Sequence, residues 1–291
     1  MLLMLAGCNK NTFPSDKIPD DAPFRFCVIG YSSYVGAFSD LESFFHVLIY
    51  VPHQKSVGDD PSTFSMTMIN DYSYALVSDI DTAVVHLLRV SLYMSGDKGD
   101  LYRMRFGTSN LSTGLFYFTD IEIEHRRTMQ KTRHSIGDWC FDVRQAPANE
   151  YIELTAASLQ TGWYLDFFGV SFVNNGSKDI EILGADIILE GKVIKPGIAV
   201  YETFDSMMQN VDQVTSDDCM VIKPGQNRTF RFDYSDSGIS RPVFLRAFFL
   251  YDSADGPLYY LPLNPMEYLP IPDEEILYKL ALNGQGLPGN Q

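Results

Sequence analysis

The sequence predicts a mainly all-β protein of two β-sandwich modules with a short C-terminal helix. Aromatic residues make up 13% of the chain, with 20 Phe and 17 Tyr, and such residues favour the pleated, half-buried surface of a sheet. Short apolar or alternating runs recur between turn residues, which is typical of antiparallel β proteins. A length of 291 residues allows two domains of about 100–200 residues each.

The first module is expected over residues 23–146. Its predicted strands are 24–29, 43–51, 64–68, 102–106, 118–124 and 139–143. The run 118–124 is typical, because Ile121 and Ile123 alternate with acidic residues. The segment 78–90 fits two structures: Ser78 and Asp81 have the spacing of a helix capping box, whereas its β-branched residues and period-two alternation favour a strand. We expect the strand, with one face formed by Val84, His86, Leu88, Val90 and Leu92.

A linker at 144–150 leads to a second module over residues 151–265. Its predicted strands are 163–173, 180–190, 243–251 and 258–263, and the segment 221–232 places a Pro224-Gly225 turn before a further alternating strand. A short helix is expected near Phe204–Val211. The last segment, 266–291, contains a helix over 273–282, because Asp273 and two acids suit a helix start and Gly284 suits its end. Its apolar residues would dock on a sandwich.

Two turns in the second module separate its predicted strands. Val173-Asn174-Asn175-Gly176 ends one strand, and Lys223-Pro224-Gly225 precedes the final strands. This pattern resembles the Ig-like sandwich modules that are common in bacterial envelope proteins. The resemblance covers roughly 151–265 and implies an Ig-like β-sandwich of the usual size, about 100 residues.

The N-terminal Leu5-Ala6-Gly7-Cys8 resembles the lipobox of bacterial lipoproteins. The resemblance implies that residues 1–8 hold the end of a signal peptide, that a peptidase cleaves before Cys8, and that the Cys8 thiol carries a diacylglycerol. Only seven uncharged residues precede Cys8, whereas signal peptides run about 15–30 residues with a positive start. We therefore expect the true start to lie upstream.

The same resemblance implies a location. Residues 9–22 are polar, contain Pro14 and Pro19, and are expected to form a tether between the lipid and the folded body. Asn9, rather than Asp, follows the cysteine, which favours the outer membrane if the rule for that position carries over. The expected location is the bacterial cell envelope, on the periplasmic or the surface face of that membrane.

Three further cysteines are Cys27, Cys140 and Cys219. A disulfide between Cys27 and Cys140 is compatible with an oxidising compartment, but their spacing does not decide it. The chain contains no Cys-x-x-Cys pair, which argues against a thiol-built zinc site or a thioredoxin-like redox site.

The net charge of −15 argues against nucleic acid as a partner, because phosphates are repelled. One segment, 125–134, nevertheless gathers four of the 22 basic residues: Arg126, Arg127, Lys131 and Arg133. These residues form a candidate site for an anionic glycan or a lipid head group, since the arginine fork binds two oxygens at once. The alternative is a solvated loop that Asp120, Glu122 and Glu124 neutralise.

Motifs for catalysis are missing or out of context. The chain has no His-Glu-x-x-His and no Gly-x-Ser-x-Gly, and the Gly-x-Gly-x-x-Gly at 284–289 follows a helix instead of joining a strand to one. We predict no catalytic residue, cofactor or metal. The interpretation is a lipid-anchored envelope protein that acts by binding or assembly, with the membrane and envelope proteins as partners. Alternatives are a fimbrillin-like fibre or adhesin subunit, and a glycan-acting hydrolase with a hidden carboxylate pair.

Overall fold

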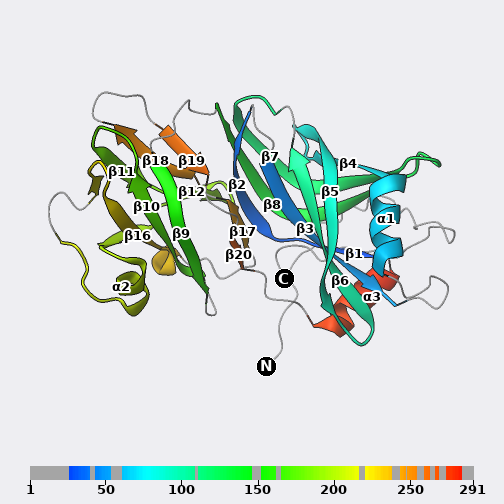
Figure 1. Cartoon of the computed structure of the whole chain (residues 1–291). Coiled ribbons are helices and arrows are strands. Elements are labelled where there is room, and N and C mark those ends of the chain that lie inside the picture. The colour runs from blue at the N-terminus through cyan, green and yellow to red at the C-terminus, as the bar shows by residue number, and fades with distance from the viewer. Residues whose placement is uncertain are drawn as a thin grey trace.

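A computed structural model describes the folded body of the chain (Figure 1). The described residues are 26–39, 43–53, 61–108, 111–145, 152–161, 165–215, 220–237, 243–246, 248–253, 259–262, 266–268 and 273–283. The lipobox with Cys8, the tether, most of the predicted linker and Cys219 lie outside them. No helix in the described part is long and apolar enough to cross a membrane.

One ten-stranded sheet runs through the first module and beyond it. Its order is β1–β3–β6–β5–β4–β7–β8–β2–β17–β20. The strands are β1 (Cys27–Ile29), β2 (Ser32–Phe38), β3 (Ser43–Pro52), β4 (Tyr72–Val77), β5 (Thr82–Ser95), β6 (Gly99–Thr108), β7 (Gly114–His125), β8 (Lys131–Arg144), β17 (Val243–Arg246) and β20 (Met266–Tyr268). All neighbours in this sheet are antiparallel except β2, which is parallel to both β8 and β17.

The sheet curls so that β1 returns to β8 and encloses the first core (Figure 1). The amide of Tyr31, just after β1, donates to the Ile136 carbonyl of β8 at 2.8 Å. Inside, Phe45 packs edge-on against Trp139 and Phe141, with ring centroids 5.2 and 5.5 Å apart. These large rings explain why the aromatic content of the chain is high.

Two four-stranded sheets form a β-sandwich as the second module, on the left of Figure 1. One sheet has the order β14–β16–β10–β9 and the other β15–β11–β18–β19. The strands are β9 (Ile152–Thr161), β10 (Leu165–Asn174), β11 (Ile180–Gly184), β14 (Gly197–Tyr201), β15 (Val221–Ile222), β16 (Asn227–Asp233), β18 (Phe248–Ser253) and β19 (Tyr259–Pro262). A separate hairpin pairs β12 (Ile187–Leu189) with β13 (Lys192–Ile194), and α2 (Phe204–Gln209) and a 3-10 turn (Ser235–Ser237) complete the module.

Strand β2 connects the two cores. All seven of its residues are buried, and alternate side chains face opposite ways, with Val35 in the first core and Tyr34 in the second. Gly36 lies in a close contact, because a Cβ there would come within 2.8 Å of the Arg246 carbonyl oxygen. Sequence patterns do not predict this strand, because two serines and a glycine hide its buried pattern.

The last helix, α3 (Glu274–Leu282), packs against β1 and β3 of the first module. The Asp273 carboxylate accepts from the Glu275 amide and caps the helix, as the acidic start predicted. Glu274 accepts hydrogen bonds from the backbone amides of Lys98 and Gly99 at 2.9 and 3.2 Å. The predicted domain boundaries stay a prediction, but β17, β20 and α3 show that the C-terminal part of the chain also builds on the first module.

The structure confirms the all-β class, the sandwich and the short C-terminal helix. The predicted strand at 64–68 is wrong, because α1 (Pro61–Asp71) covers it. Phe64 and Met68 are buried, whereas Met66 between them is 63% exposed. Residues four apart lie on the same face of a helix, whereas a strand would bury all three residues on one face. The predicted strand 180–190 is divided into β11 and β12 at Gly184, which has a φ of 151°.

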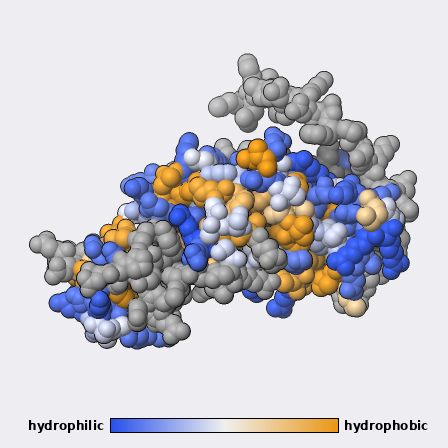
Figure 2. Space-filling model, turned by 90° about the horizontal axis from the view of Figure 1, so that it is seen from above, coloured by the Kyte–Doolittle hydropathy of each residue, from blue (hydrophilic) through white to orange (hydrophobic). Residues whose placement is uncertain are grey.

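Residues 82–90 of the ambiguous segment lie in the strand β5 (Thr82–Ser95), as expected, but the apolar face of this strand points outward. Ala83 and Val85 are buried, whereas Val84, Leu88 and Leu92 are 66%, 43% and 47% exposed. A register shift between Leu87 and Arg89 changes which side chains face the core after that point. Figure 2 shows apolar residues in several patches separated by hydrophilic ones on the face that it presents.

Docking of α3 generates a stability prediction. Leu277 is 1% exposed and belongs to the first core, so Leu277→Ala is expected to lower the free energy of unfolding by about 2–5 kcal/mol through lost burial and a cavity. Urea denaturation measures the change. Ile276→Ala is the matched control, because Ile276 is 49% exposed and its truncation should change stability by less than about 0.5 kcal/mol. Equal effects in the two variants would contradict docking of this helix.

Candidate functional site

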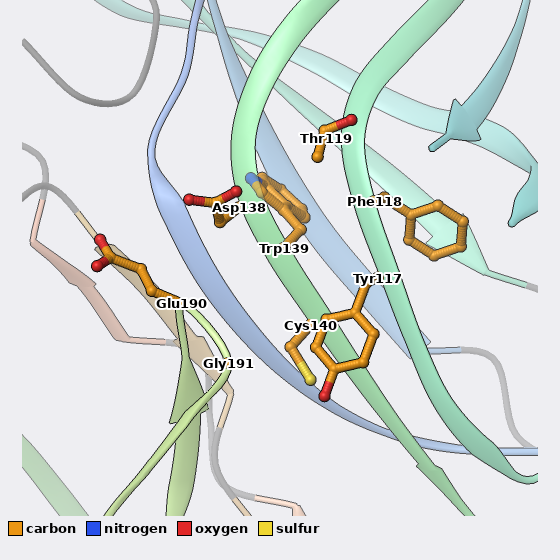
Figure 3. A pocket seen from close by; sticks show the side chains of 8 residues that line it. All are labelled: Tyr117, Phe118, Thr119, Asp138, Trp139, Cys140, Glu190 and Gly191. Atoms are coloured by element: carbon orange, nitrogen blue, oxygen red, sulfur yellow. The ribbon is translucent and has the colours of Figure 1, made fainter. Parts of the chain in front are cut away.

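A pocket lies where the first sheet meets the hairpin of the second module (Figure 3). Its volume is about 200 Å³. It is lined by Tyr117, Phe118 and Thr119 of β7, Asp138, Trp139 and Cys140 of β8, and Glu190 and Gly191 of the β12–β13 turn. Pockets at domain interfaces are a common place for small ligands, and this one suits a ligand of a single ring.

Alternation along β7 and β8 decides which side chains enter the pocket. Phe118 and Trp139 are 0% and 1% exposed and belong to the first core. Their side chains therefore point away from the pocket, although both residues line it. Tyr117 is 38% exposed and lies beside the Cys140 sulfur in Figure 3. The side chains that point outward are therefore a phenol, a hydroxyl, a thiol and a carboxylate.

The β12–β13 turn supplies the opposite wall. Glu190 and Gly191 both have positive φ values, 51° and 73°, as a two-residue type I′ hairpin requires. Gly191 adopts this conformation easily, whereas a glutamate does so seldom, which indicates that the turn fixes Glu190 at the rim. Figure 3 shows Asp138 and Glu190 coming from opposite sides of the pocket, from β8 and from this turn.

Cys140 is a poor nucleophile in this setting. Burial raises the pKa of its thiol to about 12, and the hydrogen bond with Tyr117 lowers the pKa by less than burial raises it. The thiol is therefore protonated at neutral pH, and a thiolate mechanism is unsuited to the pocket. The structure has no disulfide between Cys27 and Cys140, because the two thiols are buried in different cores.

The carboxylates of the pocket do not resemble the acid pair of a glycoside hydrolase. Asp138 and Glu190 are both exposed, whereas the general acid of such enzymes sits in an apolar setting that keeps it protonated. Within the described residues, no three His, Cys, Asp or Glu side chains gather in a way that could hold a metal ion. The chemistry that the pocket offers is hydrogen bonding and ring stacking.

The predicted basic site lies elsewhere, at the turn between β7 and β8. Lys131 lies 2.7 Å from Glu122 and 3.5 Å from Glu124, and Arg133 lies 2.9 Å from Asp120. Antiparallel pairing of β7 with β8 places these charges side by side. Lys131 and Arg133 are therefore arranged as expected for a loop that Asp120, Glu122 and Glu124 neutralise.

The other two bases lie at the tip of the same turn. Arg127 lies 3.6 Å from Asp71, and Arg126 is exposed, with its backbone amide bonded to the Asp71 carbonyl. Anion binding by the four residues stays a prediction. The structure brings them together, but it surrounds three of them with carboxylates.

His134 belongs to the same segment but not to its surface. It is 4% exposed, its Nε2 lies 3.0 Å from the Thr132 hydroxyl, and its ring packs 5.1 Å from Phe26. Burial lowers its pKa to about 4, although the nearby Asp120 acts in the opposite direction. Its immediate neighbours Arg133 and Ser135 are polar, and the one sequence signal for its burial is Ile136, which lies on the same face of the strand.

Sequence reasoning also missed the pocket. Tyr117 and Asp138 are unremarkable residues of long strands, and Glu190 closes a run that the sequence predicts as one strand. A Glu190-Gly191 pair between two apolar runs is a weak hairpin signal, and it was the one signal available.

Comparisons with known proteins give little detail. No protein-family model and no curated protein matches the chain. Two similar solved structures are a chimeric titin Z1Z2 functionalized with a KLER exogenous peptide from decorin, and DIP-gamma IG1+IG2. Each has 10% sequence identity, covers 82% of this chain and 96% of its own, and has a TM-score of 0.21. Both are Ig-domain proteins, and scores this low carry no argument about a ligand or a partner.

The buried histidine generates a pH prediction. Its folded pKa of about 4 lies below the unfolded value of 6.5, so the unfolded chain takes up a proton first as the pH falls. Stability that is present above pH 6.5 is lost as the pH falls towards 4, by about 2 kcal/mol between pH 7 and pH 5. Urea denaturation at the two pH values measures this loss.

The control separates His134 from the carboxylates, which titrate in the same range. In His134→Gln the difference in unfolding free energy between pH 7 and pH 5 should shrink by about that amount. His86→Gln, at an exposed histidine, should leave the difference as in the parent. A parent and a His134→Gln variant with the same pH dependence would rule out a buried neutral histidine.

Proposed function

We propose that the chain is a lipid-anchored protein of the bacterial cell envelope that acts by binding a ligand. The lipobox residues Leu5-Ala6-Gly7-Cys8 and the polar residues 9–22 support the anchor and the tether. The outer membrane, on its periplasmic or surface face, is the proposed location. Envelope proteins and the lipid bilayer are the partners that such a location supplies.

The pocket of Figure 3 is the observation that carries the binding role. Its side walls offer the Asp138 and Glu190 carboxylates and the Thr119 hydroxyl, all able to accept hydrogen bonds. The ring of Tyr117 offers an exposed face at the same place. Acceptors beside an aromatic ring suit a ligand rich in hydroxyl groups, and they disfavour an anion.

An uncharged sugar unit of an envelope glycan fits this chemistry. Its hydroxyl groups donate to carboxylates, and its C–H face packs on an aromatic ring. A fixed turn and two long strands hold the acceptors, so little ordering is needed when the ligand binds. Hydrolysis is a weaker candidate, because the two acids are exposed.

The anchor is tested by membrane partitioning. A version with a complete signal peptide should enter the detergent phase, with lipid on Cys8, when cells are extracted with a detergent that separates on warming. Cys8→Ala should appear in the aqueous phase or remain an uncut precursor, because no thiol is left to carry the lipid. Cys219→Ala is the control and should partition as the parent does. A Cys8→Ala variant that is cleaved and membrane-bound like the parent would refute the anchor.

The pocket is tested by binding of neutral saccharides. The folded body, labelled and applied to an array of neutral envelope oligosaccharides, should bind a subset, and calorimetry should give a saturable affinity. Tyr117→Ala should weaken that affinity about tenfold or more, since it removes the exposed ring. Asp138→Asn should weaken it as well, because a charged acceptor becomes a neutral amide.

A matched control lies two residues away on the same strand. Leu115 is 46% exposed and is not part of the pocket, so Leu115→Ala removes a similar apolar surface from the same face of β7. Its affinity should equal that of the parent. Loss of binding in Leu115→Ala, or normal binding in Tyr117→Ala, would show that the pocket is not the site.

A further inference from the structure

Two arginines from distant parts of the chain lie over the same aromatic ring. The guanidinium carbon of Arg105, in β6, lies 3.7 Å from the ring centroid of Phe44, and that of Arg246, at the end of β17, lies 5.0 Å from it. Phe44 follows the connection from β2 to β3 and points away from the core, since its neighbour Phe45 is fully buried there. We call Phe44, Arg105 and Arg246 the arginine site.

Neither guanidinium is satisfied within the protein. The Nε of Arg105 and both Nε and Nη1 of Arg246 are buried and have no hydrogen-bond partner. Buried N–H groups without a partner are costly, and a charged group costs more than a neutral one. Stacking on Phe44 accounts for one face of each guanidinium and leaves the N–H groups at its edge unused.

Three other arginines of the described residues pair with a carboxylate, although Arg228 shares with Arg103 a buried Nε that has no hydrogen-bond partner. Arg144 forms a bidentate pair with Asp142, Arg231 lies 3.1 Å from Asp233, and Arg228 pairs with Glu202. The chain has 37 acidic and 22 basic residues, so carboxylates are plentiful. Among these arginines, Arg246 is the one with two buried nitrogens that lack a partner, and Arg105 lies next to it over the same ring.

The two like charges also oppose one another. Burial and, to a smaller extent, the neighbouring charge of Arg105 together lower the pKa of Arg246 to about 10. Even so, the guanidinium remains charged at neutral pH. Like charges held together at a half-buried surface are stabilised when an anion binds between them.

Further nitrogen-bearing side chains flank Arg105 on both neighbouring strands. His46 is the cross-strand partner of Arg105 on β3, and Arg89 is its partner on β5. Two residues further along β6, Gly107 is the cross-strand partner of both Phe44 on β3 and His86 on β5. Because Gly107 has no side chain, no group of β6 lies between these two residues. No described carboxylate forms an ion pair with either arginine of the site.

We propose that Arg105 and Arg246 bind an oxyanion, namely a carboxylate, sulfate or phosphate group, against the ring of Phe44. Guanidinium forks bind two oxygens of such a group at once. The site shares no residue with the pocket of Figure 3, so it goes beyond the proposed sugar binding. It is also distinct from the basic turn, residues 125–134, whose neighbours are acidic.

Inorganic anions and a sugar acid provide the probes. Sodium sulfate, sodium phosphate and sodium glucuronate are titrated into the folded body by calorimetry, each against sodium chloride at equal ionic strength, which removes the effect of screening. At least one should bind saturably, at one site, and raise the melting temperature. Binding of sulfate or phosphate identifies a tetrahedral group as the ligand, and binding of glucuronate alone identifies a carboxylate.

Variants locate the binding. Arg105→Gln and Arg246→Gln should each weaken the affinity about tenfold or more, as expected for one charged hydrogen-bonding group. Arg105→Lys keeps the charge and should still weaken binding, because it loses the fork. Arg133→Gln makes the same change in net charge at the basic turn and should bind as the parent does.

Melting temperatures without a ligand separate a binding role from a structural one. If the arginines serve binding, Arg246→Gln should melt at or above the temperature of the parent, because it relieves repulsion and removes orphan N–H groups. If they serve packing alone, the same variant should melt lower and the parent should bind none of the three anions. That result, or equal binding by the parent and both glutamine variants, would overturn the proposal.

Discussion

The fold depends on one strand that is buried on both faces. β2 lies between β8 and β17, is parallel to both, and contributes Val35 to the first core and Tyr34 to the second. Strands with both faces covered have no solvent side, so a small residue such as Gly36 is needed where a neighbouring segment approaches closely. The two modules are therefore joined by shared backbone hydrogen bonds as well as by side-chain contacts.

Both candidate sites follow from that junction. The outer side of β7 and β8 meets the β12–β13 hairpin, and this contact forms the pocket between Tyr117 and Glu190. On the far side of β2, β17 brings Arg246 from the C-terminal part of the chain to Phe44. Each site combines residues that are more than 70 positions apart in sequence, so neither would exist in an isolated module.

Electrostatics separate the two places where basic residues gather. In the basic turn, antiparallel pairing sets Lys131 and Arg133 opposite acidic residues of β7, and the field is cancelled locally. In the arginine site, the bases of β6 and β17 meet over an aromatic ring that offers no negative charge. A cluster of basic residues in the sequence therefore does not show which charges lack a partner. Pairing across strands decides which charges are neutralised, and only the folded structure shows that pairing.

The sequence by itself determined the β class, the second sandwich and both short helices, because period-two alternation, turn residues and helix caps act locally. It failed at 64–68, where Phe64 and Met68 fit either period, and at β2, where serine and glycine conceal burial. It placed β5 correctly but not its outward apolar face, because a strand pattern does not say which side meets the core. Only the tertiary structure decided the pocket, the buried His134 and the meeting of Arg105 with Arg246. Each depends on contacts between strands that are distant in sequence, which local patterns do not encode.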